Sequence, residues 1–138
     1  MTKQEINLKW NGKMSFTTEI DGHEITIDAD ESVGGEDKGV RPKPLMLVAL
    51  AGCTSMDVIS ILHKMRVEPD YFDVHVQAEM TEEHPKHYTK FHLIYQFKGK
   101  DLPLDKLEKA VSLSQERYCG VSYFYSKVAD VSYEIEIL

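Results

Sequence analysis

The sequence has 138 residues, a length that suits one domain with a hydrophobic core, so we predict a single domain over residues 1–138. A formal net charge of −7 argues against nucleic acid and against an anionic membrane surface as partners, because both require a basic patch. The N-terminus lacks a signal-peptide pattern, and the two cysteines form no CxxC motif. These features favour a reducing, cytoplasmic setting over secretion.

The N-terminal part of the chain has the two-residue periodicity of β-strands. Residues 6–10 and 13–20 alternate, and Asp21-Gly22 then separates two alternating segments. An Asp-Gly pair in this position is a strong signal for a β-hairpin. Residues 30–41 are polar and rich in glycine, which predicts a solvated, mobile loop.

The most apolar segment follows this loop, and it predicts a long helix that begins near Leu45. From Leu45 to Met56 there is no charged residue, but Asp57 then interrupts the run. The run is shorter than the roughly 20 residues that a membrane span needs. A helix that is apolar on nearly every side is typical of a protein interior, and Gly52 predicts that another backbone approaches it closely.

The remaining segments alternate between strand and helix patterns. Residues 71–80 and 88–99 predict strands, residues 104–118 a helix that Gly120 would cap, and residues 131–138 a last strand. The order indicates an α+β domain in which an antiparallel sheet packs against a long buried helix and a second helix. One sheet does not cover a helix that is apolar all round, so we also predict a homodimer.

Two stretches resemble the OsmC/Ohr family: "PKPLMLVALAGCTSMDVISILHKMR" and, about fifty residues later, "SQERYCGVSYFYSK". The resemblance extends over most of the chain. It implies the OsmC-like fold and an intertwined homodimer with active sites at the subunit interface. It also implies reduction of organic hydroperoxides or hydrogen peroxide in oxidative-stress defence, with no cofactor.

The resemblance assigns a role to each cysteine. Cys53 would be the peroxidatic residue, whose thiolate attacks the peroxide and becomes a sulfenic acid. Cys119 would resolve it as a disulfide, and a dithiol reductant would restore both thiols. Taken alone, a cysteine in an apolar helix is more often a small core residue than a nucleophile.

The sequence departs from the family where the thiolate is supported. The peroxide-reducing branches use an arginine from the N-terminal hairpin and a glutamate before the central helix. Lys13 and Lys43 stand at these places, and lysine supplies charge without the planar fork of arginine. Our thiolate-supporting candidates are therefore Lys13, Arg117 and Glu116. Asp57, one turn after Cys53, either raises the thiol pKa or pairs with another group.

Two further patterns bear on whether the protein binds a ligand. The histidines match no zinc spacing, so we expect no metal site. The aromatic cluster after Cys119 would either wall an apolar pocket for an organic tail or pack a dimer core; its members are Tyr118, Tyr123, Phe124 and Tyr125.

Two functions therefore remain open. The first is a thiol-dependent peroxidase acting through Cys53 and Cys119. The alternative is a non-catalytic module of the same fold that binds a small molecule, with structural cysteines. The missing arginine and glutamate favour the module, and the retained cysteine pair favours the enzyme.

Overall fold

A computed structural model describes residues 2–138 of the chain. It is an α+β structure that divides into two compact units, Met1–Met46 and Leu47–Leu138. Each unit has a three-stranded sheet of its own. The sequence predicted α+β with one sheet, so the second sheet is a correction, while the prediction of one domain over residues 1–138 stays a prediction.

The first unit is built on a small antiparallel sheet in the order β1-β2-β3, with β1 at Lys9–Trp10, β2 at Phe16–Ile20 and β3 at His23–Ile27. The predicted hairpin is confirmed, because Ile20 pairs with His23 around the Asp-Gly turn. Both turn residues have positive φ, 52° at Asp21 and 80° at Gly22. Positive φ at both central positions matches the twist of the flanking strands.

The glycine-rich loop after β3 is organised around Asp28, which is buried. Its carboxylate accepts hydrogen bonds from the backbone N–H groups of Ala29, Glu36 and Lys38 at 2.7, 3.3 and 3.1 Å. A Cβ on Gly35 would lie 1.9 Å from the Ala29 carbonyl oxygen, so only glycine fits there. The loop also contains a 3₁₀ turn at Glu31–Val33. Specific hydrogen bonds therefore hold this loop, and the sequence did not predict them.

The second unit holds the larger sheet, in the order β4-β5-β6. Strands β4 (Tyr71–Met80) and β5 (Tyr88–Lys98) are antiparallel, whereas β6 (Asp130–Ile137) runs parallel to β5. The sheet is therefore mixed, which corrects the prediction of an antiparallel sheet. The cause is the helical crossover between β5 and β6, since a parallel pair needs a connection of this length.

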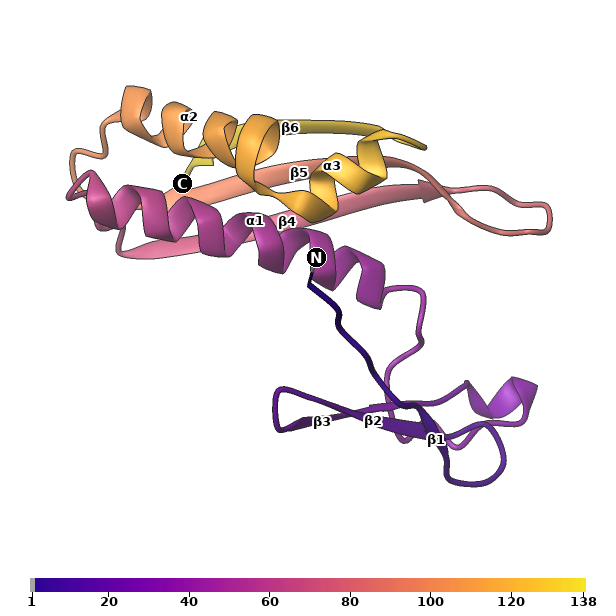
Figure 1. The fold of residues 1–138 in the computed structure, drawn as a ribbon. Coiled ribbons are helices and arrows are strands. Elements are labelled where there is room, and N and C mark those ends of the chain that lie inside the picture. The colour runs from indigo at the N-terminus through magenta and orange to yellow at the C-terminus, as the bar shows by residue number, and fades with distance from the viewer. Residues whose placement is uncertain (1) are drawn as a thin grey trace. The chain divides into compact units, whose positions relative to one another are not determined.

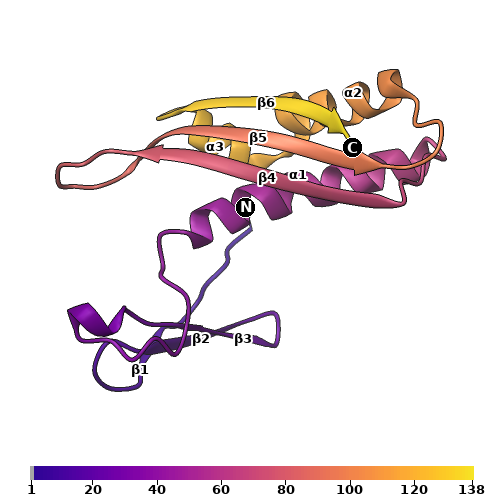
Figure 2. The ribbon, with the colours of Figure 1, turned by 180° about the vertical axis from the view of Figure 1, so that it is seen from behind.

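Three helices lie on one face of this sheet, and Figures 1 and 2 show them from opposite sides. They are α1 (Leu45–Lys64), α2 (Leu104–Leu113) and α3 (Gly120–Ser126). A π-helical turn, Ser114–Tyr118, continues α2. The core between helices and sheet consists of apolar side chains at alternate strand positions and on inner helix faces, among them Leu50, Val58, Leu62, Phe91, Leu93, Phe97, Leu107 and Val111.

Helix α1 confirms the predicted helix but is not covered all round within the chain. Leu50, Val58 and Leu62 are fully buried against the sheet unit, whereas Val48 is 64% exposed and Met56 77% exposed. The helix is long and apolar enough to span a membrane by composition alone. Its buried face nevertheless packs into the core of the sheet unit, as expected for a core helix.

Two glycine predictions are not met among residues 2–138. A Cβ on Gly52 would meet no atom within 4 Å outside its own helix turn, so no other described backbone approaches it closely. Gly120 does not cap the second helix. Cys119 ends the π-helical turn in an extended conformation, and Gly120 begins α3.

Candidate functional site

The two cysteines, far apart in the sequence, meet in the second unit. Cys53 lies in α1, Asp57 follows one turn later on the same side of the helix, and Cys119 lies between the π-helical turn and α3. The two Sγ atoms and a carboxylate oxygen of Asp57 all lie within 4.8 Å of one another. Residues four apart on a helix are neighbours, so α1 presents Cys53 and Asp57 together to Cys119.

The two thiols have different surroundings. Cys53 is partly exposed, while Cys119 is only 2% exposed. The Ser122 backbone N–H donates a hydrogen bond to the Cys119 Sγ at 3.3 Å. Burial, with a smaller contribution from the neighbouring Cys53, raises the pKa of the Cys119 thiol to about 11. Cys119 is therefore protonated at neutral pH, and Cys53 is the thiol that solvent reaches.

A buried chain of hydrogen-bonded hydroxyl groups ends at the Asp57 carboxylate. The Ser114 Oγ donates to the Asp57 carboxylate at 2.9 Å and lies 2.7 Å from the Thr54 Oγ1. The Thr54 Oγ1 is in turn 2.6 Å from the Tyr95 hydroxyl. Thr54 and Ser114 are fully buried, so these bonds satisfy hydroxyl groups that would otherwise be costly.

The same network continues to the turn that carries Cys119. The Gln115 side-chain amide donates to the Tyr95 hydroxyl at 2.6 Å, and the Ser122 hydroxyl donates to the Gln115 carbonyl oxygen at 2.5 Å. Since each hydroxyl has one proton to donate, the bonds run in one direction, from Ser122 through Gln115, Tyr95, Thr54 and Ser114 to Asp57. The network thus ties both segments of the site to the central strand β5.

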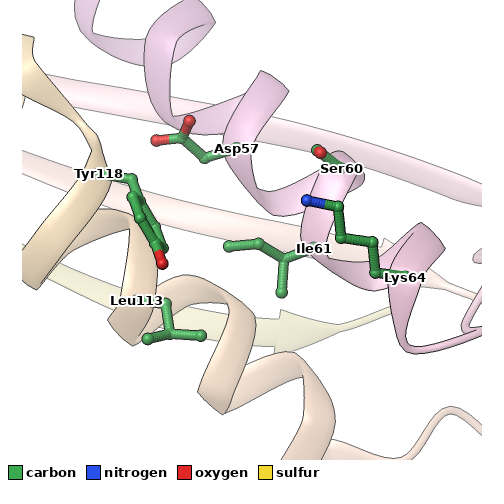
Figure 3. Close-up of a pocket in the computed structure, with 6 residues that line it drawn as sticks. All are labelled: Asp57, Ser60, Ile61, Lys64, Leu113 and Tyr118. Atoms are coloured by element: carbon green, nitrogen blue, oxygen red, sulfur yellow. The ribbon is translucent and has the colours of Figure 1, made fainter.

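A cleft of about 470 Å³ opens beside Asp57 (Figure 3). It has an apolar side and a polar side, and its lining consists of Asp57, Ser60, Ile61, Lys64, Leu113 and Tyr118. A cleft of this size, apolar with a few polar groups, is typical of a small-molecule site. Asp57 belongs to both the cleft and the sulfur cluster, so the two share this one residue.

The predicted aromatic cluster divides between these two environments. Tyr118 lines the cleft, whereas Tyr123 and Phe124 are exposed. Tyr125 is buried and stacks on Phe91 at 5.0 Å between ring centroids. Only Tyr118 therefore fits the prediction of a pocket wall.

The three thiolate-supporting candidates have other contacts in the described structure. The Lys13 ammonium, in the first unit, lies 3.7 Å from the Glu36 carboxylate. The Arg117 guanidinium lies 5.8 Å from the centre of the Tyr118 ring, and Glu116 contributes to a raised pKa of Tyr133, after burial. Arg117 and Glu116 are both exposed. Their roles toward Cys53 stay predictions.

Sequence reasoning missed the polar network and the lysine of the cleft. Thr54 and Tyr95 read as an ordinary helix position and an inward strand position, and their hydroxyl groups gave no separate signal. Ser114 recurs at helical spacing with the apolar Leu107 and Val111 in the predicted helix over residues 104–118, and a hydroxyl group on such a stripe needs a partner. That mismatch is the available clue. Lys64 lies two turns beyond Asp57 and carried no motif.

Comparison with known proteins identifies the family. The sequence profile described as OsmC-like protein matches residues 35–134. The chain belongs to this family. Protein YhfA of Escherichia coli strain K12 is 31% identical over 135 residues, which are 97% of this chain and 98% of YhfA.

Solved structures of other proteins share the fold. A hypothetical protein from Aquifex aeolicus VF5 has a TM-score of 0.84 and 31% identity, covering 100% of this chain and 99% of its own. An organic hydroperoxide resistance protein OsmC from Legionella pneumophila has a TM-score of 0.69 and 16% identity, with 99% of each chain covered. The second likeness shows the fold alone, at that identity.

Proposed function

We propose that this OsmC-like protein is a thiol-dependent peroxidase that reduces organic hydroperoxides. The observation that carries the proposal is the approach of two sulfur atoms from distant segments to within 4.8 Å, one partly exposed and one buried. Core packing does not require two thiols to meet. Attack followed by disulfide formation does require it, because the sulfurs must finish about 2.05 Å apart.

The reaction divides between the two cysteines. The Cys53 thiolate attacks the terminal peroxide oxygen, the O–O bond breaks, and the alcohol leaves with a proton while Cys53 becomes a sulfenic acid. Cys119 then loses its proton and its sulfur attacks the Cys53 sulfur; the S–O bond breaks, the hydroxyl group leaves with that proton as water, and a disulfide forms. A dithiol reductant returns both residues to thiols by exchange. Burial raises the pKa of Cys119 to about 11, so Cys119 is protonated in the resting enzyme at neutral pH.

The cleft supplies a place for the organic part of the substrate. Ile61, Leu113 and Tyr118 offer apolar surface next to Asp57, and an alkyl or aryl tail would bury against them. Structural relatives described as organic hydroperoxide resistance proteins, from Elizabethkingia anophelis and Bacillus subtilis, share the fold. They support this substrate class by analogy.

The Cys53 thiolate needs a positive partner, because the Asp57 carboxylate nearby opposes a second negative charge. Within the proposal, Lys13 or Arg117 fills this role and Glu116 orients the cation, as the family resemblance suggests. Replacing each in turn by methionine or glutamine tests the assignment. The supporting cation is the residue whose loss shifts the pH dependence of Cys53 alkylation to higher pH.

The proposal includes a cytoplasmic homodimer. The outer face of α1 exposes apolar side chains at Val48, Met56 and Ile59, and contiguous apolar surface is typical of a subunit interface. A second copy is the simplest cover for this face, since the same patch then serves both partners. The reducing setting that the cysteine pattern of the sequence predicts fits a dithiol-driven cycle.

Turnover of cumene hydroperoxide with a dithiol tests the function. We expect catalytic consumption by the wild type, none by Cys53→Ser, and a single oxidation of Cys53 without disulfide formation in Cys119→Ser. Tyr118→Ala should raise KM for cumene hydroperoxide more than for hydrogen peroxide, because it removes only the wall of the cleft. Thiol loss as slow as that of a free cysteine, unchanged in Cys53→Ser, would favour the non-catalytic binding module.

A further inference from the structure

The cluster of Cys53, Asp57 and Cys119 has the composition of a metal site as well as that of a redox pair. Two thiols and one carboxylate bring one ligand atom each, and all three atoms lie within 4.8 Å of one another. Around a tetrahedral zinc ion, with Zn–S near 2.3 Å and Zn–O near 2.1 Å, ligand atoms are separated by roughly 3.5 to 3.8 Å. Small side-chain rotations would bring the three ligand atoms from their present separations to these values.

We propose that the reduced protein binds one zinc ion per chain through the Cys53 and Cys119 sulfurs and the Asp57 carboxylate. Thiolate ligands in a tetrahedral arrangement select zinc over magnesium or calcium. Three protein ligands leave one position for water or a small thiol, as in zinc sites that are open to solvent. No sequence motif marks this site, because Cys53 and Cys119 lie 66 residues apart and no histidine takes part.

The surroundings of Asp57 support a ligand role. The Ser114 hydroxyl donates to one carboxylate oxygen at 2.9 Å, and the buried Thr54 holds Ser114 in turn. Carboxylates that bind metals are commonly fixed by such a second hydrogen bond. The bond leaves the other oxygen of Asp57 available. A carboxylate within 4.8 Å of two thiols also disfavours thiolates unless a cation balances the charge, and zinc would supply that cation.

Bound zinc and a disulfide between Cys53 and Cys119 exclude one another, because both use the same two sulfurs; this second part rests on the proposed function. Binding converts two thiols to thiolates and releases two protons. When a hydroperoxide oxidises the occupied site, two protons are taken up, the sulfurs form a disulfide, the alcohol and water leave, and the zinc ion is freed. Zinc would thus stay bound to both thiolates until a hydroperoxide oxidises them, and oxidation would release the ion.

Metal binding to the reduced, metal-free protein tests the site without peroxide. We titrate zinc against a chromophoric chelator, and cobalt(II) for the visible bands of tetrahedral thiolate coordination. The expected result is one ion per chain. We expect affinity to fall at least roughly tenfold in Asp57→Asn and by far more in Cys53→Ser and Cys119→Ser. The matched control is Asp101→Asn, an exposed turn residue with φ 53°, where asparagine is tolerated; its affinity should equal that of the wild type.

Two results would overturn the zinc site: binding that survives Cys53→Ser, or equal affinity of Asp57→Asn and the wild type. Circular dichroism of each variant checks that it is folded. Zinc release on adding cumene hydroperoxide then tests the exclusion. If zinc binds but peroxide neither releases it nor is consumed by the metal-free protein, the peroxidase proposal fails while the metal site stands. If peroxide is consumed and no zinc binds, the metal site alone fails.

Discussion

The two faces of helix α1 differ in what their side chains do. The inner face is fully buried at Leu50, Thr54, Val58 and Leu62, and it joins the apolar core to the hydroxyl network beneath Asp57. The outer face leaves Val48 and Met56 mostly exposed. The inner face therefore accounts for the stability of the chain and the position of Cys53. The outer face contributes little to either and is available to a partner.

A pair of valine substitutions gives the largest contrast between the faces. Val58→Ala removes two buried methyl groups and should lower the free energy of unfolding by about 2 kcal/mol. Val48→Ala, at a 64% exposed position, should change it by less than about 0.5 kcal/mol. Helix propensity contributes equally to both variants and cancels. Urea denaturation measures the difference, and equal effects would contradict the assignment of the two faces.

The pH dependence of stability reports on Cys119. Its pKa is about 11 in the folded chain and 9.0 for an ordinary thiol, so the unfolded state loses its proton first as pH rises. Stability from this residue is complete below pH 9 and declines as pH rises toward 11, by an amount on the order of 2 kcal/mol.

Alanine variants isolate this effect from the tyrosines, which titrate in the same range. Cys119→Ala should flatten the decline in melting temperature between pH 9 and pH 11, and Cys53→Ala, which removes only the smaller contribution to the pKa of Cys119, should flatten it less. A decline that is equally steep in Cys119→Ala and in the wild type would show that burial of Cys119 is not its cause.

The hydroxyl of Thr54 is the inner-face group that links core and site. Thr54→Val keeps the shape but removes the hydrogen-bonding partner of both Ser114 and Tyr95. Each keeps another partner, Asp57 or Gln115, so the cost should be on the order of 1 kcal/mol. Thr54→Ser retains the hydroxyl group and should keep a larger fraction of wild-type cumene hydroperoxide turnover than Thr54→Val. Equal turnover in both variants would show that the hydroxyl network does not support the activity of the site.

The outer face should matter least to the single chain and most to its association. Met56→Glu places a charge on a side chain that is 77% exposed, so the folded chain should lose less than about 0.5 kcal/mol of stability. The same change should shift the mass by light scattering from dimer to monomer, because a second copy would bury that charge. Met56→Leu keeps the face apolar and should stay dimeric. A monomeric wild type at micromolar concentration would contradict the interface.

The sequence predicted those parts of the fold that depend on local patterns. Alternation predicted the inward faces of β4 and β5, and the Asp-Gly pair predicted the first hairpin. The parallel pairing of β6 with β5 was missed, because strand direction depends on the path of the crossover rather than on the strand's own residues. The π-helical turn was missed for a related reason. It re-aims the chain from Ser114 toward Cys119, and helical periodicity alone does not distinguish it from a continued α-helix.

The candidate site was predicted by resemblance rather than by pattern. Family likeness selected Cys53 and Cys119 as a pair, and the structure shows their sulfurs close together. The partners Thr54, Tyr95 and Ser114 come from three different elements. Their hydrogen bonds depend on tertiary packing, which leaves no fixed spacing in the sequence.

The most direct test is to map the disulfide after one equivalent of cumene hydroperoxide. The fully reduced protein is oxidised, alkylated without reductant, digested and analysed by mass spectrometry. We predict one intramolecular disulfide between the peptides of Cys53 and Cys119, and no such bond when Cys53 is first blocked by alkylation. Sulfinic acid on Cys53 beside an unmodified Cys119, or thiols that remain reduced, would contradict the redox pairing of these two residues.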